Sequence, residues 1–255
     1  MSFKPILHDK KPACIGLLVA FVGTACAAPQ PPSPQPPTPG PAPSAQPATA
    51  APPAPAPPPS ALPAPIHWSQ DWTPLFDGKT LANWQVTDFG GQGPVTVQSN
   101  QIRLGMGDIL TGISWTNGPL PTNDYEISLQ AVKLDGSDFF CGLTFPVGKS
   151  WCSLILGGWG GGVVGLSSLD GSDASENETT KMLYFEPNHW FLVRLQVRTG
   201  KIRAWLDDKK IIDVSTAGRV ISLRPGPIYL SKPLGVAAYQ TSSAIRDFKL
   251  RLLKD

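Results

Sequence analysis

The sequence has few histidines and no recognisable nucleophile motif, which limits the chemistry it can support. Three histidines occur in 255 residues, so we do not expect a zinc site of the usual histidine-rich kind. No Gly-x-Ser-x-Gly sequence is present, and no order of Ser, His and Asp indicates a serine hydrolase. Gly148-Lys149-Ser150 resembles the end of a phosphate-binding loop, but the motif needs glycine where Leu143 stands.

The chain from residue 66 onward also lacks an excess of charge of either sign. Residues 66–255 hold 18 basic and 18 acidic residues, because three lysines and one aspartate of the chain's 21 and 19 precede them. A basic patch in the sequence would favour nucleic acid, and none is present. We therefore expect no nucleic-acid partner, while the sequence leaves the oligomeric state open.

Charged residues are absent from residues 29–65, which instead hold 18 of the chain's 29 prolines. Proline fixes φ and removes a backbone donor, so this stretch cannot build a core and is predicted to be a disordered, semi-rigid tether. Residues 66–255 hold all eight tryptophans and are long enough to bury a core. The chain is therefore divided into residues 1–28, 29–65 and 66–255.

Residues 1–28 have the pattern of an export signal. A basic start is followed by an apolar run over residues 15–22, which is too short to be read as a membrane span. Two endings stay open: residues 25–27 fit a cleavage site, and residues 23–26 resemble a bacterial lipobox that would lipidate Cys26. The proline stretch that follows favours the lipid anchor. We expect an exported protein, periplasmic or at the cell surface, that contacts a membrane only through such an anchor.

Cys141 and Cys152 are the only cysteines of residues 66–255. They flank a predicted hairpin with strands at 139–145 and 150–156, in which both sulfurs lie on one face. We predict a disulfide between them, as fits an exported protein. Two buried free thiols are the alternative.

Alternation of apolar and polar residues dominates the rest of the chain. It runs over residues 125–131, 191–198 and 248–252, with turn sequences between such segments and no convincing amphipathic helix. About a dozen short strands predict an all-β, two-sheet antiparallel sandwich of jelly-roll type. Residues 190–212 resemble the strand pair of laminin-G and concanavalin A-like jelly rolls, with a tryptophan, a glycine turn and an aspartate turn.

Two loops carry the residues of interest. Six of the nine residues 157–165 are glycine, and we interpret Trp159 as an exposed stacking platform for a sugar ring. The alternative places Trp159 in the core. Residues 170–178 hold four carboxylates, which can bind Ca²⁺ or supply a general acid and base, or can simply form a solvated turn.

These loops and their neighbours define the predicted site. The candidate catalytic residues are Asp170, Glu176 and His189, expected to converge within about 6–8 Å. The alternative for His189 is a hydrogen-bonded histidine at a strand edge. The candidate substrate-binding residues are Trp159, Asp138, Asp173, Asn177, Glu178 and Lys181. We expect the acidic loop to border the same cleft as Trp159.

Three segments resemble the bacterial 3-keto-disaccharide hydrolase domain family. LFDGKTLANW at residues 75–84 resembles the family's opening sequence LFDGKSLDGW. Residues 123–129 resemble its GDFEL strand, and residues 244–253 resemble its last strand. The resemblance spans residues 72–253 and implies a concanavalin A-like sandwich of a kind that is often exported and often lipid-anchored.

The resemblance implies cleavage of 3-keto glycosides. A ketone at C3 acidifies the C2 hydrogen, so a base can start elimination of the C1 substituent, and hydration follows. Stabilising the enolate requires donors or a divalent cation, and the choice stays open. The family's cleft-facing Glu and Gln are replaced here by Gly165 and Ser167, although its Asp is kept as Asp170. We therefore retain, besides the enzyme, a non-catalytic carbohydrate-binding module and a cell-envelope scaffold as alternatives.

Overall fold

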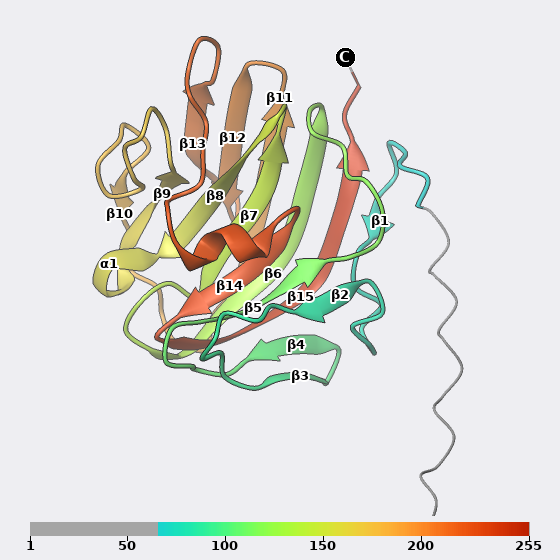
Figure 1. The fold of residues 1–255 in the computed structure, drawn as a ribbon, viewed down its shortest axis with the longest axis vertical. Helices are drawn as coiled ribbons and strands as arrows, with labels where there is room; N and C mark the ends of the chain where they lie inside the picture. The colour runs from blue at the N-terminus through green and yellow to red at the C-terminus, as the bar shows by residue number, and fades with distance from the viewer. Residues whose placement is uncertain (1–65, 255) are drawn as a thin grey trace, which may run out of the picture. The chain divides into compact units, whose positions relative to one another are not determined.

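The computed structural model describes residues 66–254, whose strands form two antiparallel sheets stacked face to face (Figure 1). The eight-stranded sheet contains β1 (Thr73–Pro74), β3 (Val95–Gln98), β4 (Gln101–Leu104), β6 (Tyr125–Gly136), β11 (Trp190–Arg198), β12 (Lys201–Leu206), β13 (Lys209–Ser215) and β15 (Thr241–Leu252). The seven-stranded sheet contains β2 (Trp84–Val86), β5 (Leu110–Trp115), β7 (Cys141–Val147), β8 (Ser150–Gly157), β9 (Val163–Ser167), β10 (Lys181–Met182) and β14 (Gly235–Tyr239). The predicted export signal, proline-rich tether and Cys26 lie outside the described residues.

The strand order is that of a jelly-roll sandwich, and the predicted all-β fold is confirmed. The larger sheet runs β13-β12-β11-β6-β15-β4-β3, with β1 paired to β15, and the smaller runs β10-β9-β8-β7-β14-β5-β2. Two short segments, α1 (Gly158–Gly161) and η1 (Pro227–Ser231), interrupt the strands. Within residues 66–254, no helix is long and apolar enough to cross a membrane.

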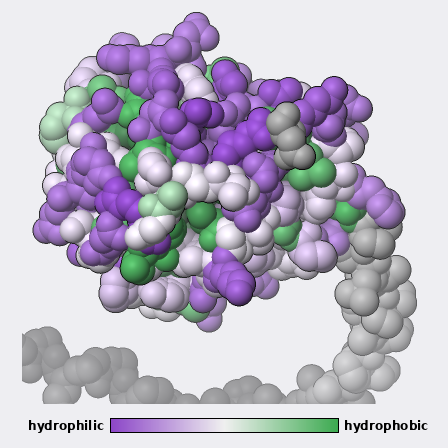
Figure 2. Space-filling view, turned by 90° about the horizontal axis from the view of Figure 1, so that it is seen from above, coloured by the Kyte–Doolittle hydropathy of each residue, from purple (hydrophilic) through white to green (hydrophobic). Residues whose placement is uncertain are grey.

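The core lies between the two sheets and follows from the alternation in the sequence. On β6, Tyr125, Ile127 and Leu129 are fully buried, and β11 alternates buried with half-buried residues along its whole length. Side chains alternate across a strand, so each sheet turns one apolar face inward. The face of the molecule seen in Figure 2 is largely hydrophilic, and hydrophobic residues appear on it in small separate areas.

The predicted disulfide between Cys141 and Cys152 is wrong, because both thiols are free and buried. The β7–β8 hairpin turns later than expected, and its register pairs Cys141 with Leu156 and Cys152 with Phe145. The two cysteines do share the inward face, but they lie four residues apart along the strands, or about 13 Å. That separation is far beyond the reach of a disulfide. The alternative of two buried free thiols is confirmed.

Burial should also make these thiols unreactive. Desolvation raises the pKa of both Cys141 and Cys152 to about 12, so the thiolate that reacts is scarce at pH 8. In a full-length variant with Cys14→Ser and Cys26→Ser, we expect no rapid reaction with a disulfide reagent until the protein is unfolded. Two thiols should then react without prior reduction. Reaction only after reduction would show that the pair is oxidised.

The opening motif at residues 75–84 builds the sandwich rather than the pocket described below. Asp77 accepts hydrogen bonds of 2.7 Å from the backbone N–H of Lys79 and from the N–H and hydroxyl of Thr80. Gly78 adopts φ +79°, a conformation that favours glycine. Trp84 is 5% exposed, donates its indole N–H to the carbonyl of Leu75 at 2.8 Å, and packs on Trp115 and Phe248.

Candidate functional site

A pocket of about 420 Å³ opens on the outer face of the seven-stranded sheet. Its floor comes from β5, β8, β9 and β14, and its rim comes from α1 and the segment leading into η1. In Figure 1, η1 crosses in front of this sheet. The lining residues are Ile109, Leu110, Asp138, Phe139, Ser153, Ile155, Trp159, Ser167, Arg224, Pro225, Gly226, Pro227, Ile228 and Tyr239.

The hollow exists because outward positions of this sheet carry small residues. Thr144 and Ser153 face each other across β7 and β8 with their hydroxyls 2.8 Å apart, and Ser153 pairs with Ser167 of β9. In the next row Ile155 lies beside Gly142, where an added Cβ would come within 2.9 Å of the Phe139 ring. Small side chains on the floor leave room for a ligand between the rims.

Trp159 stands at the rim of this pocket and is 40% exposed. Although α1 is short and helix-like, Trp159 and Gly160 both have left-handed dihedrals, with φ of 49° and 87°. The segment is therefore a left-handed turn that presents the indole outward. The guanidinium carbon of Arg224 lies 5.5 Å from the indole centroid, within cation–π range. The alternative that buries Trp159 in the core is wrong.

Asp138 is the carboxylate that lines the pocket. One of its oxygens accepts the N–H of Phe139 at 2.8 Å, and the other accepts the N–H of Gly160 at 3.1 Å. The second bond ties the carboxylate to the turn that carries Trp159. Each carboxylate oxygen can accept further hydrogen bonds, so Asp138 keeps capacity toward the pocket.

Asp173 lies behind the pocket and positions two of its lining residues. Its carboxylate forms an ion pair of 2.7 Å with Arg224 and accepts a hydrogen bond from the Ser167 hydroxyl. It also accepts the N–H of Ala174 at 2.8 Å. Asp173 itself does not line the pocket, and its side chain is only 14% exposed. The acidic loop thus reaches the cleft of Trp159 through Arg224.

The other acidic residues of the loop face elsewhere. Asp170 and Glu178 both bind the guanidinium of Arg219. The pKa of Asp170 is lowered mainly by the backbone N–H of Val220 and then by Arg219, and the pKa of Glu178 is lowered mainly by Arg219. Both groups are ionised at neutral pH and neither lines the pocket. The structure does not support the predicted catalytic role of Asp170 in this pocket.

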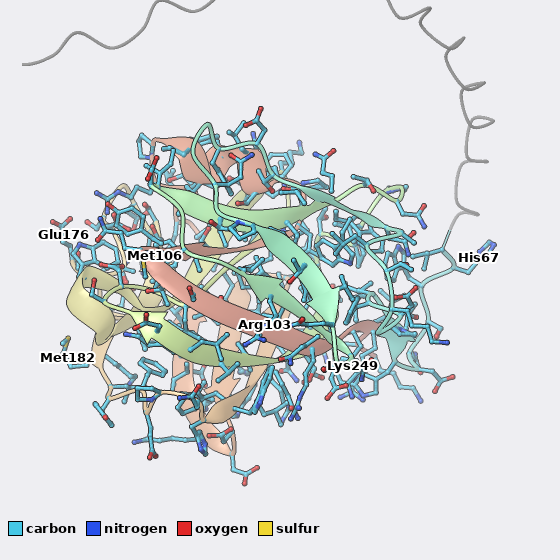
Figure 3. The ribbon with its side chains drawn as sticks, turned by 90° about the horizontal axis from the view of Figure 1, so that it is seen from below. His67, Arg103, Met106, Glu176, Met182 and Lys249 are labelled. Atoms are coloured by element: carbon cyan, nitrogen blue, oxygen red, sulfur yellow. The ribbon has the colours of Figure 1, made fainter. Side chains whose placement is uncertain are left out.

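Glu176, His189 and Lys181 are exposed and also lie outside the pocket lining. Glu176 lies at the periphery of the molecule in Figure 3. His189 precedes β11, with its ring 4.6 Å from that of Phe191, and Lys181 begins the edge strand β10. The predicted meeting of Asp170, Glu176 and His189 around the pocket is therefore wrong.

Asn177 holds the acidic loop together. Its amide nitrogen donates to the carbonyl oxygens of Leu166, Ser172 and Asp173 at 2.7, 3.1 and 2.7 Å. Its amide oxygen accepts from Thr179, both backbone and hydroxyl. A side chain with this many backbone partners is structural, so Asn177 is a positioning residue rather than a contact for substrate.

The loop also explains the loss of one polar position on β9. Gly165 stands where the family sequence carries a cleft-facing side chain, and an added Cβ would lie 2.6 Å from the carbonyl oxygen of Ala174. Ala174 packs with Ile155 and Val163 in a small buried cluster. The loop thus covers β9 at this point, whereas Ser167 remains in the pocket lining.

Arg224 is the one cation among the pocket's lining residues, and the sequence did not predict it. It lies 65 residues from Trp159 in the chain. The serines of the floor carried a weak signal, since Ser153 and Ser167 are polar positions in otherwise apolar strands. Among residues 66–254, no cluster of three or more His, Cys, Asp or Glu side chains could hold a metal ion.

Comparison with known proteins gives one family and several distant structures. The family model described as the 3-keto-alpha-glucoside-1,2-lyase-like domain matches residues 71–250. No curated protein matches the chain. The carbohydrate-binding module CBM66 from Bacillus subtilis is 12% identical with a TM-score of 0.46, covering 66% of this chain and 95% of that one. A structure described as a native glycosidic hydrolase is 10% identical with a TM-score of 0.49, covering 72% and 97%. At identities this low, the likeness is one of fold alone.

Proposed function

The chain belongs to the 3-keto-alpha-glucoside-1,2-lyase-like domain family, and from this membership we propose that its pocket binds a 3-keto-α-glucoside and eliminates the substituent at C1. One observation carries the proposal. A stacking indole, a carboxylate and a guanidinium, those of Trp159, Asp138 and Arg224, line one pocket on the outer face of the smaller sheet.

The pocket suits a single sugar unit. Its volume of about 420 Å³ falls within the range of small-molecule sites. The apolar face of a pyranose ring can stack on Trp159, while Ser153 and Ser167 offer hydroxyls to the polar edge of the ring. The tilted rings of Phe139 and Tyr239, with centroids 5.9 Å apart, add an apolar wall.

In the proposed reaction, Asp138 is the base. Its carboxylate takes the proton from C2, and the electrons of that C–H bond form an enolate with the C3 ketone. The enolate then collapses: the C3 carbonyl re-forms, a C1=C2 double bond forms, and the C1–O bond breaks. Protonated Asp138 or water returns a proton to the leaving oxygen, and addition of water across the double bond follows.

Arg224 stabilises the negative charge on the C3 oxygen. Asp173 fixes one side of its guanidinium at 2.7 Å, and the remaining donors are free to point at an oxyanion. A donor that is already oriented loses little freedom when charge develops, which is the condition for electrostatic catalysis. Asp173 acts here as a positioning residue.

We further propose that this activity takes place outside the cytoplasm. The basic and apolar pattern of residues 1–28 and the uncharged proline-rich stretch of residues 29–65 support that location. Carbohydrate is the ligand in this proposal, and the lipid anchor at Cys26 is its membrane attachment.

The proposal is tested by offering the full-length protein a 3-keto-α-glucoside and the same glucoside without the ketone, with products followed by NMR. We expect turnover of the first only. Trp159→Ala should raise KM about 5- to 30-fold, the equivalent of about 1–2 kcal/mol of stacking, with a smaller change in kcat. Binding of both sugars without any product would instead identify a carbohydrate-binding module. If the protein neither binds nor turns over either sugar, the remaining alternative is a cell-envelope scaffold.

A further inference from the structure

The outer face of the eight-stranded sheet is strongly basic, although residues 66–255 as a whole are neutral. The register carries two rows of outward side chains across it. One row runs Lys249, Ser128, Arg194, Trp205, Lys210, and the other runs Arg251, Glu126, Gln196, Arg203, Asp213. We call this surface the basic face. Its cationic residues are Arg103, Arg194, Arg198, Lys201, Arg203, Lys210, Arg246, Lys249 and Arg251.

Few carboxylates balance these cations. Glu126 is fully buried beneath the basic face and is bonded by Arg194 and by Arg251, at 2.8 and 2.6 Å. Asp213 pairs with several cations at once, as Lys201, Arg203 and Lys210 all lie within 3.5 Å of it. Asp124 lies 3.6 Å from Arg198, and Asp247, in the bulge of β15, lies 4.0 Å from Arg246. The cations outnumber their partners and remain about one-third exposed or more where they pair.

The aromatic residues of the basic face are already occupied. The guanidinium of Arg251 lies 4.4 Å from the centroid of Trp72, that of Arg246 lies 4.0 Å from Trp190, and that of Arg194 lies 5.1 Å from Trp205. Each of these indole rings is therefore covered by a guanidinium group and is not open for stacking. A surface of this kind does not offer the open stacking platforms with which proteins hold single-stranded nucleic acid or sugar rings.

The three hollows described for residues 66–254 lie away from the central strands of the basic face. Neither the site pocket nor two smaller hollows beside β13 are lined by residues of β6, β11 or β15. The excess of cations favours a partner that meets this surface over a wide area, through charge. From that excess and the occupied rings, we infer that the basic face docks on the anionic headgroups of a lipid bilayer.

This orientation has a geometric result for the pocket. The basic face and the pocket lie on opposite outer faces of the same sandwich, as the two sheets of Figure 1 show. Docking by the basic face therefore directs the pocket away from the bilayer, where a soluble ligand can enter. The inference stands independently of which ligand the pocket binds.

The test is sedimentation of the full-length protein with vesicles of phosphatidylglycerol and phosphatidylcholine, and with phosphatidylcholine alone, with Cys26→Ser in every protein compared so that the proposed lipid anchor does not contribute. The variant carries Arg103→Glu, Arg203→Glu and Lys249→Glu, and Figure 3 labels the first and last on the adjacent strands β4 and β15. Its control carries Lys79→Glu, Lys149→Glu and Lys232→Glu, an equal change of net charge on exposed or half-exposed residues away from the basic face.

We expect the basic-face variant to bind anionic vesicles at least tenfold more weakly than wild type, while the control stays within about threefold. Binding of wild type should weaken as salt is added. If reversal impairs folding, Arg103→Gln, Arg203→Gln and Lys249→Gln give the same comparison with a smaller loss. Equal losses in variant and control would overturn the inference. Tighter binding to a soluble anionic polysaccharide or to nucleic acid than to anionic vesicles would also overturn it.

Discussion

Asp138→Asn is expected to lower kcat/KM for a 3-keto-α-glucoside by about 100- to 10,000-fold, the range that a lost general base produces. The amide has nearly the shape of the carboxylate but cannot take the C2 proton. Its oxygen can still accept one of the two backbone N–H groups that bond Asp138 in the wild type. Sugar binding should therefore change less than turnover.

Exchange at C2 gives a direct measure of the base. In D₂O the wild type should exchange the C2 hydrogen of the substrate, and Asp138→Asn should not. Glu176→Gln is the matched control, because Glu176 is an exposed carboxylate of the acidic loop that does not line the pocket, and its activity should stay within about twofold of wild type. Retained exchange in Asp138→Asn would assign the base to another group.

Trp84→Ala is expected to cost about 3–5 kcal/mol of unfolding free energy, the usual range for truncating a buried aromatic residue. Trp84 lies 5.2 Å from Trp115 and 5.0 Å from Phe248, measured between ring centroids. Its indole N–H also bonds the carbonyl of Leu75. The substitution removes both aromatic contacts and this bond, so a midpoint decrease of about 10 °C or more should accompany it.

The matched control is the same substitution at an exposed position. Trp159→Ala should change the unfolding free energy by about 0.5 kcal/mol or less, since the indole lies at the rim of the pocket. Urea unfolding followed by circular dichroism measures both variants. Similar stabilities for the two variants would mean that the opening motif does not hold the sandwich together.

The fold was predictable because its signal is local and repeated. Alternation over residues 125–131 and 191–198 places successive side chains on opposite faces, and β11 shows that pattern of burial, whereas residues 125–129 of β6 are buried on both faces. The β7–β8 register was not predictable to the residue, and a shift of the turn moved Cys141 opposite Leu156. The disulfide prediction failed for that reason alone.

The sequence predicted a site residue correctly only where the residue and its immediate neighbours in the chain were enough to indicate its position. Trp159 is flanked by glycines, and the prediction that it is exposed is confirmed. Asp138, also predicted, lines the same pocket. The role of Arg224 could not be predicted, because its contacts with Trp159 and Asp173 join segments that are far apart in the sequence, and no local pattern indicates them. The count of carboxylates in residues 170–178 was misleading, since Arg219 neutralises two of them.

The attachment of the acidic loop by Asn177 has a consequence for how the pocket can change among related proteins. That segment rests on β9 through polar bonds of Asn177, Asp173 and Thr179 and through the small Ala174 cluster, and it contributes little to the space between the sheets. The length and composition of the loop can therefore change without disturbing the sandwich. Each such change would alter one side of the pocket through the ion pair between Asp173 and Arg224. In proteins related to this chain, the sequence of this loop would then determine which substrates the pocket accepts. A comparison of strand residues alone would not detect that difference.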